Sequence, residues 1–308
     1  MDQAEKAKRA LEKKTAKEIS DLYVDLSTYM AVHVDDFAGV STNLTPQAKK
    51  VILNQLRQEM KRILQEMESK EADIITKAAK ESGDNVMLYI NKLMLGVGLD
   101  MTGSYPQLVD KSVDNVLSGK VYKKDWNLWR ALRSNTNQIV SDADRIIQWG
   151  IDEQKSLYDI VTDLSNYVNP KEKSKFKVTK KHKIAAYAQR IARTVIQHVY
   201  QFVTRGVCKN NPYIQAFRWS SAGAPNTCAI CSERDGMLFP IGLEPLDHPN
   251  GLCWLELVTM PADKFMSMVS RWTEGQYNEI EYYITDAFGY SNKKVVKNVA
   301  SHYMNQHY

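Results

Sequence analysis

Residues 226–254 read NTCAICSERDGMLFPIGLEPLDHPNGLCW, and the fold of the C-terminal part of the chain depends on them. Cys228 and Cys231 form a CxxC pair and are followed by His248 and Cys253, so the spacing is Cys-x2-Cys-x16-His-x4-Cys. A CxxC turn lets both sulfurs face one ion, and three thiolates with one imidazole suit a tetrahedral metal site. We expect zinc in a structural role, because four protein ligands leave no open position for water or substrate.

Two other interpretations of these cysteines stay open. Cysteine is often buried without a ligand, and a reduced CxxC can act as a redox pair. A thioredoxin-type redox motif needs a βαβ frame, whereas the flanks here are rich in turn formers. These are Gly223, Pro225, Asn226, Gly236 and Pro240. The remaining cysteine, Cys208, is expected to be a buried thiol, with replacement of Cys253 in the site as the alternative.

A longer set of motifs surrounds the cysteines. It consists of Trp219, the CxxC pair, Arg234-Asp235-Gly236, Phe239-Pro240, His248-Pro249-Asn250 and Cys253. Upstream, residues 191–194 read IART, and residues 147–160 contain Gly150. Together these motifs resemble the signature of the Mu F-like family, the minor head or head morphogenesis proteins of tailed bacteriophages. The resemblance covers roughly residues 126–253.

Two positions depart from the pattern of that family. Gly251 stands where the first closing cysteine usually falls, and Leu252 replaces an arginine. Cys253 is therefore the available fourth ligand.

The resemblance implies a biological setting. Members of the family are present in few copies inside phage heads, are linked to the portal and help DNA to enter or leave. For this chain the resemblance implies the portal protein and packaged double-stranded DNA as partners, with scaffold or major capsid protein as further candidates. It also implies a location inside the head, after assembly in the host cytoplasm.

Composition indicates a chain that can bury a core and has no membrane segment. Of the 308 residues, 44% are hydrophobic and 25% are charged, which is ordinary for a soluble protein. The first twenty residues are charged throughout, and no apolar run reaches the length that spans a bilayer. We therefore expect synthesis and assembly in a cytoplasm, where cysteines stay reduced.

The charges are segregated along the chain. Residues 173–232 contain eleven basic and no acidic residues, so 30 of the 41 basic residues remain elsewhere, against all 36 acidic ones. Lysines on a flexible junction suit contacts to phosphates, and a solvated linker is the alternative. For Arg193 the alternative is an ion pair with a carboxylate of a neighbouring helix. The candidate nucleic-acid-binding residues are Lys173, Lys175, Lys177, Lys180, Lys181, Lys183, Arg190 and Arg193.

Hydrophobic periodicity predicts a mainly α fold. Helices are expected over about 4–34, from Pro46 to Ser82-Gly83, over 85–99, after Asp125, and over 139–149, 156–167 and 184–202. The first turns of the first helix are expected to project until they meet a partner. Trp126 and Trp129 are expected in the core, and His198 is expected to be packed rather than a ligand. Gln197 is expected with Arg190 and Arg193 on a polar face.

Beyond Gly206 the pattern changes to strands. Residues 213–219 and 252–258 are expected to be strands, with a turn at Asp235-Gly236 and a helix that begins at Pro261. The predicted architecture is an elongated helical body, a small C-terminal zinc-clipped β unit over 213–258 and a helical C-terminal extension. The predicted regions are 1–125, 126–258 with the basic linker and helix at 171–205, and 259–308.

The leading functional hypothesis is a non-enzymatic head protein that binds DNA without sequence preference and assists its packaging or ejection. An HNH-like nuclease is an alternative suggested by the CxxC and the Asp247-His248 pair. Such a nuclease needs a histidine base and further metal-holding residues, and His302 and His307 alone follow His248. A purely structural connector without DNA contact is the third hypothesis.

Overall fold

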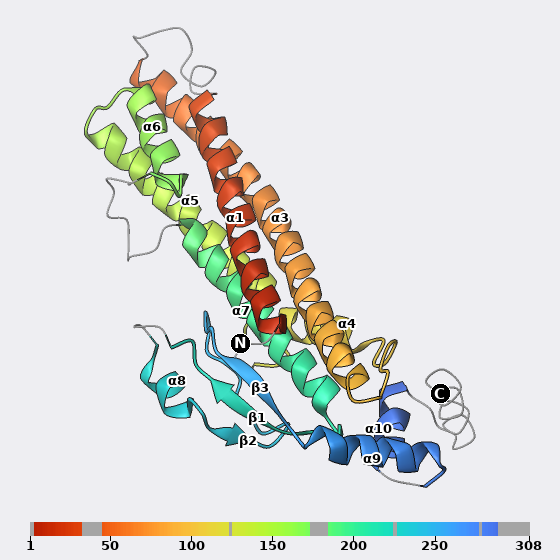
Figure 1. Cartoon of the computed structure of the whole chain (residues 1–308). Helices are drawn as coiled ribbons and strands as arrows, with labels where there is room; N and C mark the ends of the chain where they lie inside the picture. Colours follow the sequence, from red (N-terminus) through yellow and green to blue (C-terminus); the bar gives the residue numbers. More distant parts are fainter. Residues whose placement is uncertain are drawn as a thin grey trace. The chain divides into compact units, whose positions relative to one another are not determined.

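A computed structural model describes residues 3–32, 45–122, 125–172, 184–223, 227–276 and 279–288 (Figure 1). These residues form nine α-helices and one three-stranded antiparallel sheet. The predicted mainly α fold with a small β unit towards the C-terminal end is thereby confirmed. None of the helices in the described part is both long and apolar enough to cross a membrane.

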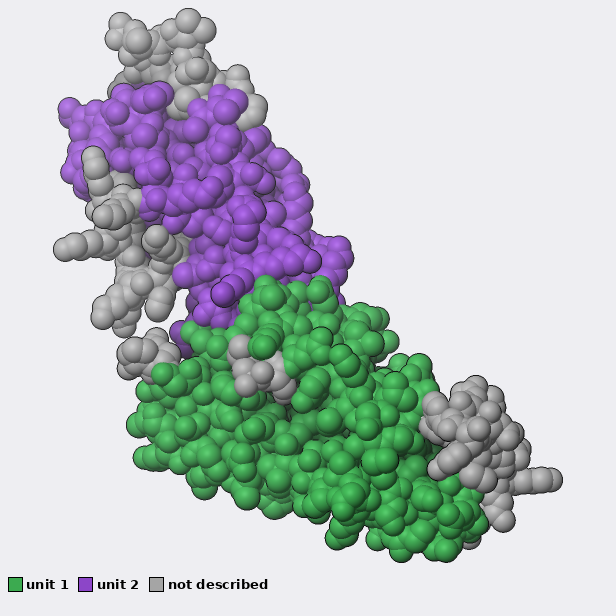
Figure 2. All heavy atoms as spheres, viewed as in Figure 1, with its two compact units in different colours: residues 1–11, 79–116, 194–308 green, residues 12–78, 117–193 purple. Residues whose placement is uncertain are grey.

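The chain divides into two compact units (Figure 2). Unit 1 consists of Met1–Leu11, Ala79–Val116 and Thr194–Tyr308, and unit 2 consists of Glu12–Ala78 and Leu117–Arg193. Helices α1 (Gln3–Val32), α3 (Pro46–Leu95) and α7 (Ile184–Cys208) contribute residues to both units. The predicted regions 1–125, 126–258 and 259–308 are continuous in sequence, whereas each compact unit combines separate segments of the chain. The predicted regions therefore stay a prediction.

Unit 2 is helical and includes α5 (Leu128–Asp152) and α6 (Leu157–Val168). Both helices begin with a side-chain cap, since Asn127 Oδ1 accepts the N–H of Arg130 at 2.9 Å and Ser156 Oγ accepts that of Asp159 at 3.0 Å. Apolar residues at spacings of three and four form the buried stripes of these helices. Helix α1 has a buried stripe of the same kind. The stripe residues of α1 and α5 are Ile19, Tyr23, Leu26, Met30, Leu132, Ile139, Ala143 and Ile146.

The expectation of a tryptophan core in α5 is wrong. Trp129 is 53% exposed, whereas its neighbours Leu128 and Leu132 are buried. Trp126 precedes the helix and is half-buried. The buried stripe therefore passes through Leu128 and Leu132 and leaves out Trp129.

Unit 1 contains the sheet, with strand order β2-β1-β3. The strands are β1 (Ile214–Ser220), β2 (Leu238–Phe239) and β3 (Trp254–Thr259). The bounds of β1 and β3 agree with those of the two predicted strands to within two residues. Phe217, Trp219 and Leu255 are buried on one face, while Arg218 and Glu256 are exposed on the other. After β3, α9 (Ala262–Thr273) begins behind Pro261 as expected, and α10 (Glu279–Phe288) follows.

The predicted helix end at Ser82-Gly83 is wrong, because α3 continues without a break to Leu95. Gly83 has a packing role instead: a Cβ at this position would lie 2.7 Å from Cγ1 of Val109 on α4 (Leu108–Leu117). Ser82 Oγ donates a hydrogen bond to the carbonyl oxygen of Ile196 on α7 at 3.3 Å. A Ser-Gly pair that usually signals a helix end thus permits close helix packing here.

The first turns of α1 do not project from the protein. Ala4, Glu5, Lys8 and Leu11 are all buried within unit 1, and Lys8 is only 1% exposed. The sequence favoured projection because this segment offers few apolar residues, but polar contacts hold it instead.

Candidate metal centre

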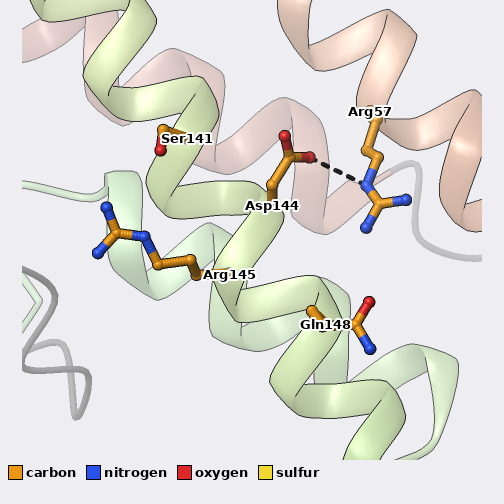
Figure 3. A pocket seen from close by; sticks show the side chains of 5 residues that line it. All are labelled: Arg57, Ser141, Asp144, Arg145 and Gln148. Carbon is orange, nitrogen blue, oxygen red and sulfur yellow. Dashed lines mark ion pairs between the residues drawn. The ribbon is translucent and has the colours of Figure 1, made fainter.

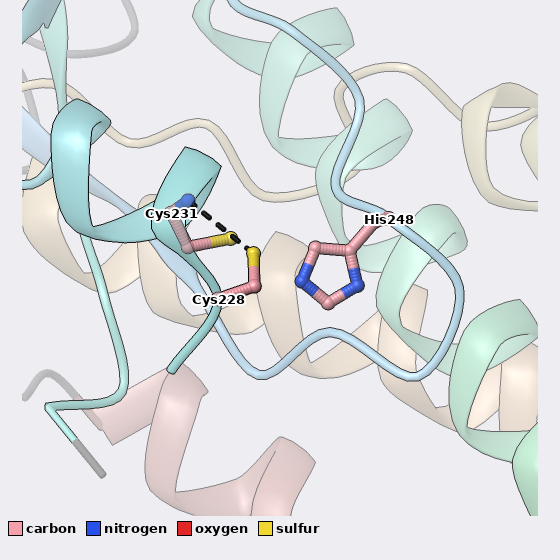
Figure 4. A group of neighbouring side chains, drawn as sticks. All are labelled: Cys228, Cys231 and His248. Carbon is pink, nitrogen blue, oxygen red and sulfur yellow. Dashed lines mark hydrogen bonds between the residues drawn. The ribbon is translucent and has the colours of Figure 1, made fainter. Parts of the chain in front are cut away.

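Three neighbouring segments of unit 1 carry the four predicted metal ligands. Cys228 lies directly before the short helix α8 (Ala229–Arg234), and Cys231 lies in its first turn. Cys228 caps this helix, because its Sγ accepts the backbone N–H of Cys231 at 3.4 Å (Figure 4). His248 lies in the loop after β2, and Cys253 directly precedes β3. The N-cap geometry turns both sulfurs of the CxxC towards one side of α8.

The side chains come together as two overlapping groups. The ligand atoms of Cys228, Cys231 and His248 lie within 4.8 Å of one another, and those of Cys231, Asp247 and Cys253 do as well. Figure 4 shows the imidazole of His248 facing the two sulfurs of the CxxC. Ligand atoms around one tetrahedral zinc ion lie about 3.5–3.8 Å apart, so these separations exceed the bound values by about 1 Å at most. Cys231 belongs to both groups, whereas Cys253 lies in the second group only, so the four predicted ligands form a connected cluster that could hold a metal ion.

Asp247 belongs to this centre but was not among the predicted metal ligands. Its side chain is buried and accepts hydrogen bonds from the backbone N–H groups of His248 at 2.8 Å and Cys253 at 3.2 Å and from Gln197 Nε2 at 3.1 Å. The thiol of Cys231 is a fourth donor, at 4.0 Å. These bonds occupy both carboxylate oxygens and fix the loop that carries two of the predicted ligands. We therefore assign Asp247 to positioning and Cys253 to coordination.

Gly251 lies directly against the buried carboxylate of Asp247. A Cβ at position 251 would lie 2.1 Å from Oδ2 of Asp247, which leaves no room for any side chain. A cysteine at this position cannot coexist with the buried carboxylate. The available thiol on this side of the loop is that of Cys253, which agrees with the predicted ligand set.

Side chains of α7 form hydrogen bonds with the backbone of the loop 247–253. His198 Nε2 lies 3.0 Å from the carbonyl oxygen of Asp247, and Gln201 Oε1 accepts the backbone N–H of Asp247 at 2.9 Å. One turn earlier, Thr194 Oγ1 accepts the backbone N–H of Asn250 at 2.9 Å. His198 is thus packed, as expected, and burial lowers its pKa to about 4, so that it is neutral at physiological pH.

The prediction that Gln197 lies on a polar face of α7 is wrong. Gln197 is fully buried, as is every residue from 194 to 201. A helix segment that is covered on all sides has no solvent-facing side to which a polar residue could be assigned. Its polar residues instead bond the loop 247–253, and this role has no signature in the sequence.

The titration of the thiols follows from their surroundings. The backbone N–H of Cys231 lowers the pKa of Cys228 by stabilising its thiolate, whereas burial raises the pKa of Cys231 and of Cys253. Burial opposes the charged form of His248, but its contacts with Pro249 and Asp247 raise its pKa overall. Metal binding would therefore release protons from the two buried thiols.

The donor set fits zinc better than harder ions. Three thiols and one imidazole are soft or borderline ligands, and hard cations such as Mg²⁺ and Ca²⁺ take oxygen ligands instead. Cys208 belongs to neither group, because it is a fully buried thiol at the end of α7, as expected.

The six predicted DNA-contacting lysines between 173 and 183 lie outside the described residues, as do His302 and His307. Of the predicted nucleic-acid-binding residues, Arg190 is exposed and Arg193 is half-buried, both in the first part of α7. The structure therefore describes these two arginines alone among the eight candidates.

Unit 2 carries a shallow hollow away from the cysteines (Figure 3). Its arginines are paired with carboxylates: Arg57 Nε lies 3.0 Å from Asp144 Oδ1, and Arg145 Nη2 lies 3.4 Å from Asp142 Oδ1. The hollow therefore offers little uncompensated charge to a ligand. It is lined by Arg57, Ser141, Asp144, Arg145 and Gln148.

Comparisons with protein-family models, with curated proteins and with solved structures find no match to this chain. The sequence motifs and the geometry of the metal centre are therefore the basis of the functional proposal.

Proposed function

We propose that this chain is a non-enzymatic head protein of a tailed phage, in which a structural zinc ion stabilises the C-terminal β unit and the basic segment contacts packaged DNA. The zinc centre has the strongest support. The observation that carries it is the convergence of Cys228, Cys231, His248 and Cys253, which the spacing of the motif predicts and the two overlapping groups contain.

The metal would supply stability that the β unit lacks. Helix α8 has six residues and β2 has two, and several apolar side chains around them are exposed rather than packed. Ile230 is 56%, Leu238 is 58% and Leu243 is 74% exposed. Binding of a structural zinc ion contributes about 10–16 kcal/mol in small zinc domains, which is enough to hold α8 and the 247–253 loop in place.

Elemental analysis of the purified chain tests the zinc centre. We expect one equivalent of zinc in the wild type and its loss in Cys228→Ala. Cys208→Ala is the matched control, because it also removes a thiol but lies in neither ligand group. Equal zinc contents in the two variants would refute the proposed ligand set.

The DNA contact is supported by charge. Residues 173–232 contain eleven basic residues and no acidic one, and one of the eleven, Arg190, is exposed on α7. Lysine and arginine bind phosphates by releasing counterions, which gives affinity without reading base sequence. We therefore expect binding that weakens steeply with salt and varies little between unrelated duplexes.

Charge reversal separates this DNA contact from a purely structural role. The test variant carries Glu at Lys175, Lys177, Lys180 and Lys181. The control has the same net charge and carries Glu at four exposed lysines elsewhere, Lys13, Lys14, Lys70 and Lys111. We expect the test variant alone to lose DNA binding in fluorescence anisotropy at low salt. DNA binding equal to that of the control variant would contradict the DNA role.

The proposed position in the head is next to the portal protein, and the resemblance to the Mu F-like family is the support for this partner. Co-sedimentation of the chain with portal oligomers measures this contact directly. A second measurement is the incorporation of the chain into heads that are assembled in its presence. If the charge-reversed variant loses DNA binding but still enters heads, portal docking and DNA contact use different residues. Failure of the wild-type chain to bind portal oligomers or to enter heads would contradict the proposed location.

A further inference from the structure

A buried ammonium group lies beside the metal centre. Lys8, near the start of α1, is 1% exposed, and its Nζ lies 2.9 Å from Oε2 of Glu5, which is fully buried. The same nitrogen lies 4.8 Å from the centre of the Tyr200 ring and donates a hydrogen bond to Oε1 of Gln197. A buried charge is costly unless it is paired and hydrogen-bonded, and Lys8 has both kinds of partner.

Gln197 connects this lysine to the loop that carries two metal ligands. Its Nε2 donates to Oδ2 of Asp247 at 3.1 Å and to the carbonyl oxygen of Cys253. The orientation of the amide follows from chemistry: an ammonium group has only donors, whereas the carboxylate and the carbonyl are acceptors. Gln197 therefore has to present its oxygen to Lys8 and its nitrogen to the loop.

The contacts form one continuous buried path within unit 1. It runs from Glu5 to Lys8, through Gln197 to Asp247, and from there to the backbone N–H groups of His248 and Cys253. Arg9 provides a second link between the N-terminal segment and the metal centre. Its Nε lies 2.6 Å from Oε1 of Glu5, and its guanidinium lies 5.4 Å from the ring centre of Trp254, the residue that follows Cys253.

We propose that metal binding and the docking of residues 3–11 are thermodynamically linked, with Lys8 and Gln197 as positioning residues of the metal centre. This inference rests on the proposed zinc centre. Lys8 holds the amide of Gln197, the amide holds Asp247 and Cys253, and these fix the loop in its ligand-presenting conformation. In the other direction, a metal ion that fixes the loop also fixes the acceptors for the N-terminal segment.

The size of the linkage follows from the behaviour of other metal sites. Loss of an outer-shell hydrogen bond typically lowers metal affinity by about 10- to 100-fold. Linkage is reciprocal for binding free energies, so the metal should strengthen docking of residues 3–11 by the same factor. The N-terminal segment would then report whether the metal centre is loaded.

The first experiment measures zinc affinity by competition with a chromophoric chelator. In Lys8→Met the aliphatic stem is retained and the ammonium group is lost, and we expect zinc affinity to fall by about 10- to 100-fold. Lys6→Met is the matched control, because Lys6 is exposed on the same helix. Since Lys8 acts through Gln197, adding Lys8→Met to Gln197→Leu should cause no further loss of affinity.

The second experiment needs no substitution. Amide hydrogen exchange of the wild-type chain is compared with and without zinc, over residues 7–11 and over α6 in unit 2 as reference. We expect zinc removal to speed exchange at 7–11 by about 10- to 100-fold and to leave α6 unchanged. Unchanged exchange at 7–11 while residues 247–253 lose protection would overturn the linkage.

The two proposals can fail separately. If the wild type binds one equivalent of zinc and Lys8→Met binds it as tightly as Lys6→Met, the linkage is refuted and the zinc centre stands. If the wild type binds no zinc, the proposed function fails, and the linkage fails with it.

Discussion

Asp247→Asn is the substitution that probes the metal centre without touching a ligand. The change keeps the shape of the side chain and replaces one carboxylate oxygen with an NH₂ group. That group would face a donor in either orientation. On one side it would meet the N–H of His248, and on the other side those of Gln197 and Cys253. At least one buried N–H group therefore loses its acceptor.

The expected loss can be estimated from these contacts. A buried donor left without a partner costs about 1–3 kcal/mol, and the NH₂ group that faces it adds a second such donor. We therefore expect the free energy of unfolding of the zinc-loaded chain to fall by about 2–4 kcal/mol. Zinc affinity should fall by about 10- to 100-fold, because the loop that presents His248 and Cys253 is less well held.

Urea unfolding and chelator competition measure the two effects. Asp235→Asn is the matched control, since Asp235 is an exposed carboxylate of the same β unit that accepts the N–H of Ser221 at 2.7 Å. The control should lose less than about 1 kcal/mol, because water can replace its bond. If Asp247→Asn unfolds at the same urea concentration as Asp235→Asn and binds zinc equally well, Asp247 does not position the loop.

Three further predictions concern the helices and the sheet. Burial raises the pKa of Glu71 to about 7, so its protonated form stabilises the fold at low pH and this contribution is lost as pH rises through 7. Between about pH 5 and pH 8 the free energy of unfolding should fall by roughly 2–3 kcal/mol more in the wild type than in Glu71→Gln. Arg205→Ala leaves the buried Glu244 carboxylate without its ion pair and should cost about 3 kcal/mol, whereas Arg218→Ala removes an exposed pair and should cost under about 1 kcal/mol, both by urea unfolding. Gly206→Ala would place a Cβ 2.6 Å from a side chain of α4 and should lower stability in thermal unfolding by about 1–3 kcal/mol.

Each of these predictions has an opposing result. Parallel pH profiles for the wild type and Glu71→Gln would mean that the pKa of Glu71 is the same in the folded and the unfolded chain. Equal effects of Arg205→Ala and Arg218→Ala would mean that burial of the carboxylate does not matter. A Gly206→Ala variant as stable as the wild type would mean that α4 can move away from α7 at no cost.

Much of the helical fold and the clustering of the cysteines could be predicted because local signals determine them. The stripe Ile19, Tyr23, Leu26 and Met30 has the helical period, and its residues are buried. The CxxC turn places two sulfurs together through three residues of backbone, whatever the rest of the chain does. Strand β3 follows directly after Cys253, where alternation indicated it.

The wrong predictions for Gly83, for the first turns of α1 and for Gln197 share one physical cause, which is contact between segments far apart in sequence. Gly83 continues a helix because Val109 needs the space that a Cβ would fill. Gln197 and Lys8 are buried because each supplies the partner that the other needs, across 189 positions of the chain. Asp247 organises the centre through backbone N–H groups, which every residue type carries, so no spacing rule indicates it. Periodicity and motif spacing contain no information about such pairings.

The most direct measurement of the metal centre is zinc K-edge X-ray absorption on the purified, DNA-free chain. Coordination by Cys228, Cys231, His248 and Cys253 predicts one zinc ion with three sulfur neighbours at about 2.3 Å and one nitrogen at about 2.0–2.1 Å. A first shell of oxygen and nitrogen alone, or a chain that holds no zinc, would contradict it.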